Sequence, residues 1–136
     1  MAHGSELIDL AVRFSAELDE CTATGGANID RLMAMIHPDA VRLIDGKAAS
    51  AQVGVAAIRD GYLSRARALT QEVELHGVDV WGELVVCRLT RRDSGMTTPG
   101  AEHHLRILLV RDGRIQRILV VTDPSEDKAL RGISHA

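Results

Sequence analysis

The segment from His103 to Asp123, HHLRILLVRDGRIQRILVVTD, constrains the fold more than any other part of the chain. Two aliphatic runs flank Asp112 and Gly113, a dipeptide that two-residue hairpin turns favour because both of its positions must adopt a positive φ. We therefore predict a β-hairpin that turns at Asp112 and Gly113.

If Arg111 pairs with Arg114, the alternation of side chains along each strand fixes the two faces of this hairpin. One face would hold His103, Leu105, Ile107, Leu109, Gln116, Ile118, Val120 and Thr122. The other would hold His104, Arg106, Leu108, Val110, Ile115, Arg117, Leu119, Val121 and Asp123. Both faces are largely apolar, so we expect one to line the interior and the other to meet a partner subunit or a covering segment. The face that carries the arginines suits the outside, and His103 is then expected to point inward.

Composition limits the class of protein. With 136 residues the chain is expected to form one domain, with a core over about residues 5–124 and a polar tail over 125–136. A net charge of −3 without a basic run argues against nucleic-acid binding. The chain has neither a signal-like N-terminus nor an apolar run of about 18 residues, so we expect a cytoplasmic protein that does not bind membranes. Cys21 and Cys87 are expected to be reduced thiols.

Apolar periodicity concentrates the expected helices in the first half of the chain and most expected strands in the second half. Helices are expected over residues 5–21, 28–37 and 55–69, and strands over 40–45, 72–80, 84–92, 103–111 and 114–123. This order predicts an α+β fold in which a curved antiparallel sheet wraps around the three helices of the N-terminal half. Such a sheet leaves a cavity at one end.

A general acid and a general base must reach one substrate atom from surroundings that push their pKa values apart. Asp45 and His103 are the candidates, because both lie at strand ends that should meet at the open end of the fold. Tyr62 is expected to present its hydroxyl to the interior. The structural alternatives are a turn at Asp45, a loop edge at His103 and simple packing of Tyr62. We expect ligand contacts from Phe14, Trp81, Leu105, Ile118, Val120 and Asp123.

Two other patterns in the sequence concern metal binding and surface charge. His103 and His104 are neighbours on a strand and point to opposite faces, so we expect no metal site, and nothing in the sequence implies a cofactor. Several late-strand arginines should form a solvated outer face, the alternative being a basic rim that attracts an anionic ligand. These are Arg88, Arg91, Arg92, Arg106, Arg111, Arg114 and Arg117.

Three segments carry a resemblance to a known superfamily: HPDAV at residues 37–41, GVAAIRDGY at 54–62, and VRDGRI at 110–115 followed by Asp123. They resemble the nuclear transport factor 2 like (NTF2-like) superfamily, which includes SnoaL-like polyketide cyclases, ketosteroid isomerases, scytalone dehydratase and limonene epoxide hydrolase. The resemblance covers residues 5 to about 124 and implies a cone-shaped α+β barrel.

The resemblance also implies roles for single residues. The proton-shuttling base of the ketosteroid isomerases would fall near Asp45 and their late-strand acid on His103. Their oxyanion-hole tyrosine would fall on Phe14, which has no hydroxyl, so steroid isomerisation is not expected. In SnoaL-like cyclases a histidine and an aspartate act together. His103 could supply the first, whereas Asp123 falls on the other face of its strand.

Two functions of different classes follow from these expectations. The first is a SnoaL-like, cofactor-independent isomerase, cyclase, dehydratase or hydrolase that acts by general acid-base catalysis on a small, mostly apolar organic molecule. The second is a non-catalytic ligand-binding or dimerisation module of the same fold. In both cases we expect a homodimer that packs through the outer face of its sheet. A cavity with two or more inward ionisable groups would favour chemistry, and one filled by aliphatic side chains would favour the module.

Overall fold

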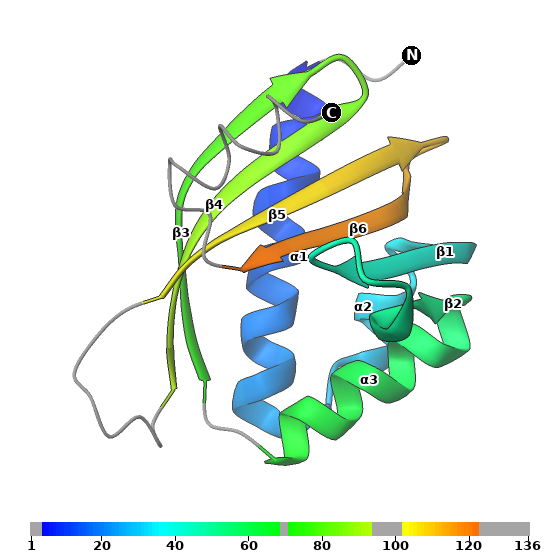
Figure 1. The fold of residues 1–136 in the computed structure, drawn as a ribbon, viewed down its shortest axis with the longest axis vertical. Coiled ribbons are helices and arrows are strands. Elements are labelled where there is room, and N and C mark those ends of the chain that lie inside the picture. Colours follow the sequence, from blue (N-terminus) through cyan, green and yellow to red (C-terminus); the bar gives the residue numbers. More distant parts are fainter. Residues whose placement is uncertain (1–3, 69–70, 94–101, 123–136) are drawn as a thin grey trace.

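The computed structural model describes residues 4–68, 71–93 and 102–122. The helices are α1 (Gly4–Thr24), α2 (Ile29–Met33) and α3 (Val55–Ala68), with a 3₁₀ turn at Ala48–Ser50. The strands are β1 (Ile36–Ile44), β2 (Gln52–Val53), β3 (Gln71–Trp81), β4 (Leu84–Asp93), β5 (Glu102–Arg111) and β6 (Arg114–Thr122). Figure 1 shows one curved sheet that bends around α1, with α3 lying across the end near β1 and β2. The expected α+β fold class, a curved sheet around helices, is confirmed.

The six described strands form a single sheet in the order β2-β1-β6-β5-β4-β3. Strands β3 to β6 are antiparallel neighbours, as the sequence predicts. Strand β1, in contrast, pairs with β6 in parallel, and the two-residue strand β2 then pairs with β1. The sheet is therefore mixed. The parallel pair places the end of β1 beside the end of β6, where the cavity described below opens.

The boundary between α2 and β1 lies earlier than predicted. Ile36, expected to be the last apolar residue of the second helix, is the first residue of β1 and pairs with Ile115. Asn28 precedes α2 without making a side-chain cap. Its amide Nδ2 instead donates to the backbone oxygen of Glu17 at 2.8 Å and to a Glu17 carboxylate oxygen at 3.0 Å. The short helix is thus held by α1 rather than by its own cap.

The predicted hairpin is present, and its turn has the predicted geometry. Asp112 and Gly113 have φ values of 54° and 75°. Both central residues of the turn therefore adopt the left-handed conformation that makes an aspartate-glycine pair suitable. Val110 pairs with Ile115 as expected.

Beyond this turn the predicted register is wrong, because β6 contains a bulge. Leu109 pairs with Arg117, so Gln116 is an extra residue opposite the Leu109–Val110 step. A bulge residue shifts all later pairs by one position and reverses the side-chain parity of one strand against the other. As a result Thr122 pairs with His104 and not with His103.

The bulge corrects the assignment of the inner face. On β5, His104 and Leu108 are buried, whereas His103 is exposed. The predicted inward direction of His103 is therefore wrong, as is the outward direction of the face that carries Arg106. On β6 the prediction is correct beyond the bulge, since Ile118 is fully buried. The inner face of the hairpin holds His104, Arg106, Leu108, Val110, Ile115, Ile118, Val120 and Thr122.

The core fills the space between the inner face of the sheet and the helices. It is built almost entirely from aliphatic side chains, with Phe14 as its largest fully buried member. Other side chains with essentially no exposed surface are Leu32, Ile58, Val85, Leu108, Ile115 and Ile118. Among the described residues, none of the helices combines the length and the apolar character that crossing a bilayer requires.

Candidate active site

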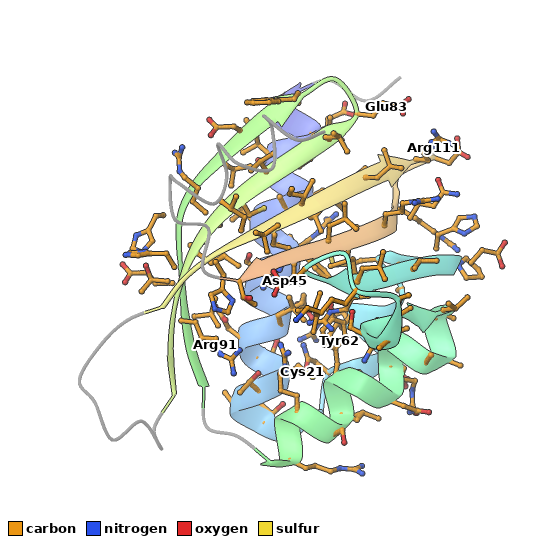
Figure 2. The ribbon with its side chains drawn as sticks, in the orientation of Figure 1. Cys21, Asp45, Tyr62, Glu83, Arg91 and Arg111 are labelled. Atoms are coloured by element: carbon orange, nitrogen blue, oxygen red, sulfur yellow. The ribbon has the colours of Figure 1, made fainter. Side chains whose placement is uncertain are left out.

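A cavity of about 80 Å³ lies between α1, α3 and the inner face of the sheet. Its apolar lining consists of Leu18, Cys21, Ile44, Val73, Leu89 and Val120. Its polar lining consists of Asp19, Thr22, Arg42, Tyr62, Arg65, Arg91, His104, Arg106 and Thr122. In Figure 2, Cys21 of α1 and Tyr62 of α3 lie between the helices and the sheet. The cavity is therefore more polar than the sequence led us to expect.

Local periodicity explains why these particular side chains meet. On the strands they come in pairs two residues apart, such as His104 with Arg106 on β5, because alternate strand residues share a face. On the helices they are separated by three or four residues, as Tyr62 and Arg65 are on α3. Each element thus supplies a short row of side chains to the same space.

Among the arginines that line the cavity, Arg42 on β1 is the most buried, with 5% of its surface accessible. Its guanidinium carbon lies 5.4 Å from the centre of the Tyr62 ring, which is the geometry of a cation–π contact. Its Nε atom is buried and has no hydrogen-bond partner in the described part of the chain. A buried donor without a partner is costly, so Arg42 bears a desolvation cost in the free protein.

Arg106 on β5 is half-buried and makes two contacts with α1. Its Nη1 donates to the hydroxyl of Ser15 at 2.9 Å, and its guanidinium carbon lies 5.6 Å from the centre of the Phe14 ring. Burial lowers the pKa of Arg106, because the charged form loses its hydration. The side chain is therefore a positioned cation at the inner wall of the cavity.

Arg65 on α3 is repelled by three other arginines, Arg42, Arg91 and Arg106. Burial, together with repulsion from Arg42 and Arg91, lowers its pKa to about 10. The described residues give Arg65 neither a hydrogen bond nor an ion pair. Arg65 remains protonated near neutral pH, so the described residues that line the cavity include more cationic than anionic side chains.

Asp19 supplies the carboxylate among the described lining residues, and it lies at the mouth rather than inside, since its side chain is exposed. Partial burial raises the pKa of Asp19, and the charge of Arg106 opposes this shift. One exposed carboxylate does not balance the arginines around it.

Two groups that can transfer protons face the same space from opposite walls. Tyr62 is 6% exposed and His104 is 7% exposed, and both line the cavity. The thiol of Cys21 also lines it, but burial raises the pKa of this thiol, which keeps it neutral and poorly nucleophilic. In the part of the chain that the structure describes, there is no cluster of three or more histidine, cysteine or acidic side chains that could hold a metal ion.

The structure does not bring Asp45 and His103 together in this cavity. Asp45 follows β1 in the left-handed conformation, with a φ of 53°. Its Oδ1 accepts a hydrogen bond from the backbone N–H of Thr122 at 2.8 Å, and its Oδ2 accepts one from the Thr122 hydroxyl. Asp45 therefore joins β1 to β6 beside the cavity, in the turn that was the structural alternative. His103 is exposed on the other side of the sheet.

The remaining predicted site residues lie in different parts of the structure. Tyr62 and Val120 line the cavity. Phe14 and Ile118 are fully buried core residues, and Leu105 is half-buried on the outer face of β5. Trp81 lies at the β3–β4 turn with 71% of its surface exposed, and Asp123 lies outside the described residues.

The sequence analysis missed His104 and the inward arginines. The bulge at Gln116 explains why His104 and Arg106 were not predicted to line the cavity, since both were assigned to the outer face. Arg42 carried a usable signal: it interrupts the apolar residues Val41, Leu43 and Ile44 within a strand. An arginine within an apolar strand needs either solvent or a polar cavity.

No protein-family model and no curated protein sequence matches the chain, but solved structures do. An NTF2-like protein of unknown function from Mesorhizobium loti matches with a TM-score of 0.68 and 15% identity, over 90% of this chain and 94% of that one. A candidate polyketide cyclase from Sinorhizobium meliloti matches with a TM-score of 0.63 and 21% identity, over 79% and 93%. An LEH-like epoxide hydrolase from M. tuberculosis matches with a TM-score of 0.63 and 19% sequence identity, over 93% of each chain. At these identities the likeness concerns the fold, and it shows that the chain adopts the NTF2-like α+β cone.

Proposed function

We propose that this protein binds a small organic molecule in the cavity and transforms it by cofactor-independent general acid-base catalysis. The observation that carries this proposal is that Tyr62 and His104, both buried, line the same cavity. An imidazole and a phenol on opposite walls can act on two sites of one bound molecule. Two of the structural neighbours are named as a polyketide cyclase and an LEH-like epoxide hydrolase, so proteins of this fold include enzymes.

The proposed step is an enolisation. The imidazole of His104 takes a proton from a carbon next to a carbonyl group, and the electron pair of that C–H bond moves toward the carbonyl oxygen. Tyr62 donates a hydrogen bond to this oxygen as negative charge develops on it. The neighbouring arginine charges stabilise the same oxygen. In a β,γ-unsaturated ketone, return of the proton from His104 to the γ-carbon moves the double bond and completes an isomerisation. In a substrate with a second carbonyl group, the enolate carbon attacks that carbonyl carbon, and the carbonyl oxygen takes the proton from His104, which gives a cyclisation.

Solvent deuterium incorporation tests this step without knowledge of the natural substrate. A panel of small ketones, keto acids and enones in D₂O should include compounds whose α-protons exchange faster with the protein than in buffer. His104→Ala should slow this exchange by about 10²–10⁴-fold, the usual contribution of a general base. Tyr62→Phe should slow it because a donor to the developing oxyanion is lost. The readout is the ¹H NMR signal of each α-proton.

His103→Ala is the matched control, because it removes the neighbouring imidazole from the exposed face and should leave the exchange rate unchanged. Equal losses in His103→Ala and His104→Ala would contradict the proposed role of His104. A wild-type protein that binds members of the panel without speeding their exchange would favour the second function, a non-catalytic binding module. The position of Asp19 at the mouth favours that alternative, since no carboxylate base lines the inner part of the described cavity.

The proposal also retains two expectations from the sequence. We expect the protein to act in the cytoplasm and as a homodimer that packs through the outer face of β5 and β6. This face carries the half-buried apolar residues Leu105, Ile107, Leu109, Leu119 and Val121. Sedimentation velocity should give the mass of a dimer, and the mass of a monomer would contradict the second expectation.

A further inference from the structure

The charges that line the cavity are strongly unbalanced. Arg42 of β1, Arg65 of α3 and Arg106 of β5 reach it, against the single exposed carboxylate of Asp19 among the described lining residues. Removing a guanidinium from water is costly unless a partner compensates for the lost hydration. The free protein bears this cost at a place where the fold itself does not require arginine, because apolar side chains from the same elements fill the adjacent core. A cost of this kind is typical of binding sites.

Two of these arginines lack the partners that a structural arginine usually has. The Nε of Arg42 is buried without a hydrogen-bond acceptor. Arg65 has no recorded acceptor within the described residues and is repelled by Arg42, Arg91 and Arg106. A third, Arg106, is held in place by Ser15. Guanidinium groups make their strongest hydrogen bonds to carboxylate and phosphate oxygens, frequently two at a time. The cavity therefore has several guanidinium groups in its wall that can donate to one anionic group.

The rest of the wall limits what the anion can be. Leu18, Ile44, Val73, Leu89 and Val120 line the same cavity and offer no hydrogen bonds from their side chains. An inorganic ion would leave this surface in contact with water, whereas a short aliphatic chain would cover it. The cavity volume of about 80 Å³ suits a ligand of only a few carbon atoms.

We infer that the substrate or ligand is a small organic anion, with its head group held by Arg42, Arg65 and Arg106 and its short apolar part against the aliphatic wall. This inference rests on the proposed function, since it names the chemical class of the molecule that the same cavity takes. Carboxylates and phosphate monoesters share the required chemistry. It replaces the mostly apolar ligand expected from the sequence.

The experiment is an NMR titration of ¹⁵N-labelled protein with three compounds of similar size: butyrate, propyl phosphate and the neutral butyramide. Butyrate or propyl phosphate should bind at least about tenfold more tightly than butyramide. The tighter of the two anions identifies the head group. The inference would be overturned if neither anion bound more tightly than butyramide, or if neither anion gave saturable shifts.

Arg65→Met and Arg67→Met form a matched pair on α3. Arg65 lines the cavity, whereas Arg67 is exposed two residues later. Arg65→Met should weaken anion binding by at least about tenfold, and Arg67→Met should leave it unchanged. Because Arg65→Met removes a cation that its neighbours repel, its melting temperature should equal or exceed that of the wild type. Similar anion affinities of the two variants would contradict the inference.

Asp19→Asn should change anion affinity in the opposite direction to Arg65→Met. It removes the negative charge at the mouth, so butyrate or propyl phosphate should bind a few-fold more tightly, while butyramide binding should stay the same. Weaker anion binding in this variant would count against a head group held by the arginines.

The two proposals can fail separately. If anion binding depends on Arg65 but no α-proton exchange depends on His104, the ligand class stands and acid-base catalysis is wrong. If exchange depends on His104 but butyramide binds as well as both butyrate and propyl phosphate, catalysis stands and the anionic ligand class is wrong.

Discussion

Asp45 shows how a residue that suits catalysis can instead hold the fold together. Its carboxylate accepts hydrogen bonds from both the backbone N–H and the hydroxyl of Thr122. Thr122 lines the cavity and pairs with His104 across β5 and β6. The aspartate therefore fixes the end of β6 from the end of β1, across the parallel strand pair that the sequence did not predict.

We predict that Asp45→Gly lowers the free energy of unfolding by about 1–3 kcal/mol, the usual cost of leaving buried or half-buried polar groups without their partner. Glycine is chosen because Asp45 has a positive φ, which glycine tolerates without strain. Asp112→Gly is the matched control. Asp112 also has a positive φ but is exposed in the β5–β6 turn, so this variant should change stability much less. Urea denaturation measures both, and equal losses would show that Asp45 acts only through its backbone conformation.

At the scale of elements, the contact between α1 and α2 depends on Glu17. Its carboxylate forms an ion pair with Arg31 Nε at 2.8 Å and accepts a hydrogen bond from Asn28. The hydrogen bonds from Arg31 and Asn28 lower the pKa of Glu17. Because α2 has only five residues, it is not expected to be stable without such contacts.

This pKa direction gives a pH dependence with a definite sign. A carboxyl group with a lower pKa in the folded than in the unfolded state stabilises the fold above its unfolded pKa, which is about 4.3 for glutamate. That contribution is lost as the pH falls through the folded pKa. Glu17→Gln should therefore lower the melting temperature at pH 7 and make little difference at about pH 3. Asp9→Asn, on the exposed face of α1, is the control, and a Glu17→Gln effect that is equal at both pH values would contradict the assignment.

The β5–β6 hairpin shows how much of an element the sequence can predict. The turn follows from Asp112 and Gly113, because their requirement for positive φ is a local property. Which side chains point into the core depends on the bulge at Gln116, because the bulge allows Ile115 and Ile118 to be buried on the same face of the sheet. Residues three apart on a regular strand face opposite sides, so two large buried aliphatic residues at this spacing were a possible signal. With both faces of the hairpin apolar, the pattern alone could not select between them.

At the scale of the whole molecule, the order and type of the elements could be predicted because helical and strand periodicities are local. The parallel pairing of β1 with β6 could not, since it joins segments more than 70 residues apart in the sequence, as the Asp45–Thr122 contact shows with a separation of 77. The candidate site depends on such long-range pairing. This explains why Tyr62, placed by helical periodicity, was found, whereas His104 and Arg106, placed by register, were assigned to the outside.

The account depends most on the claim that the arginines around this cavity receive an organic anion within reach of His104 and Tyr62. A crystal structure of the protein soaked with butyrate tests it most directly. The predicted result is a carboxylate within hydrogen-bond distance of guanidinium nitrogens of Arg42, Arg65 or Arg106, with the aliphatic chain against Leu89 and Val120. Butyrate bound only outside the cavity, or inside it with its carboxylate directed away from all three arginines, would contradict the account.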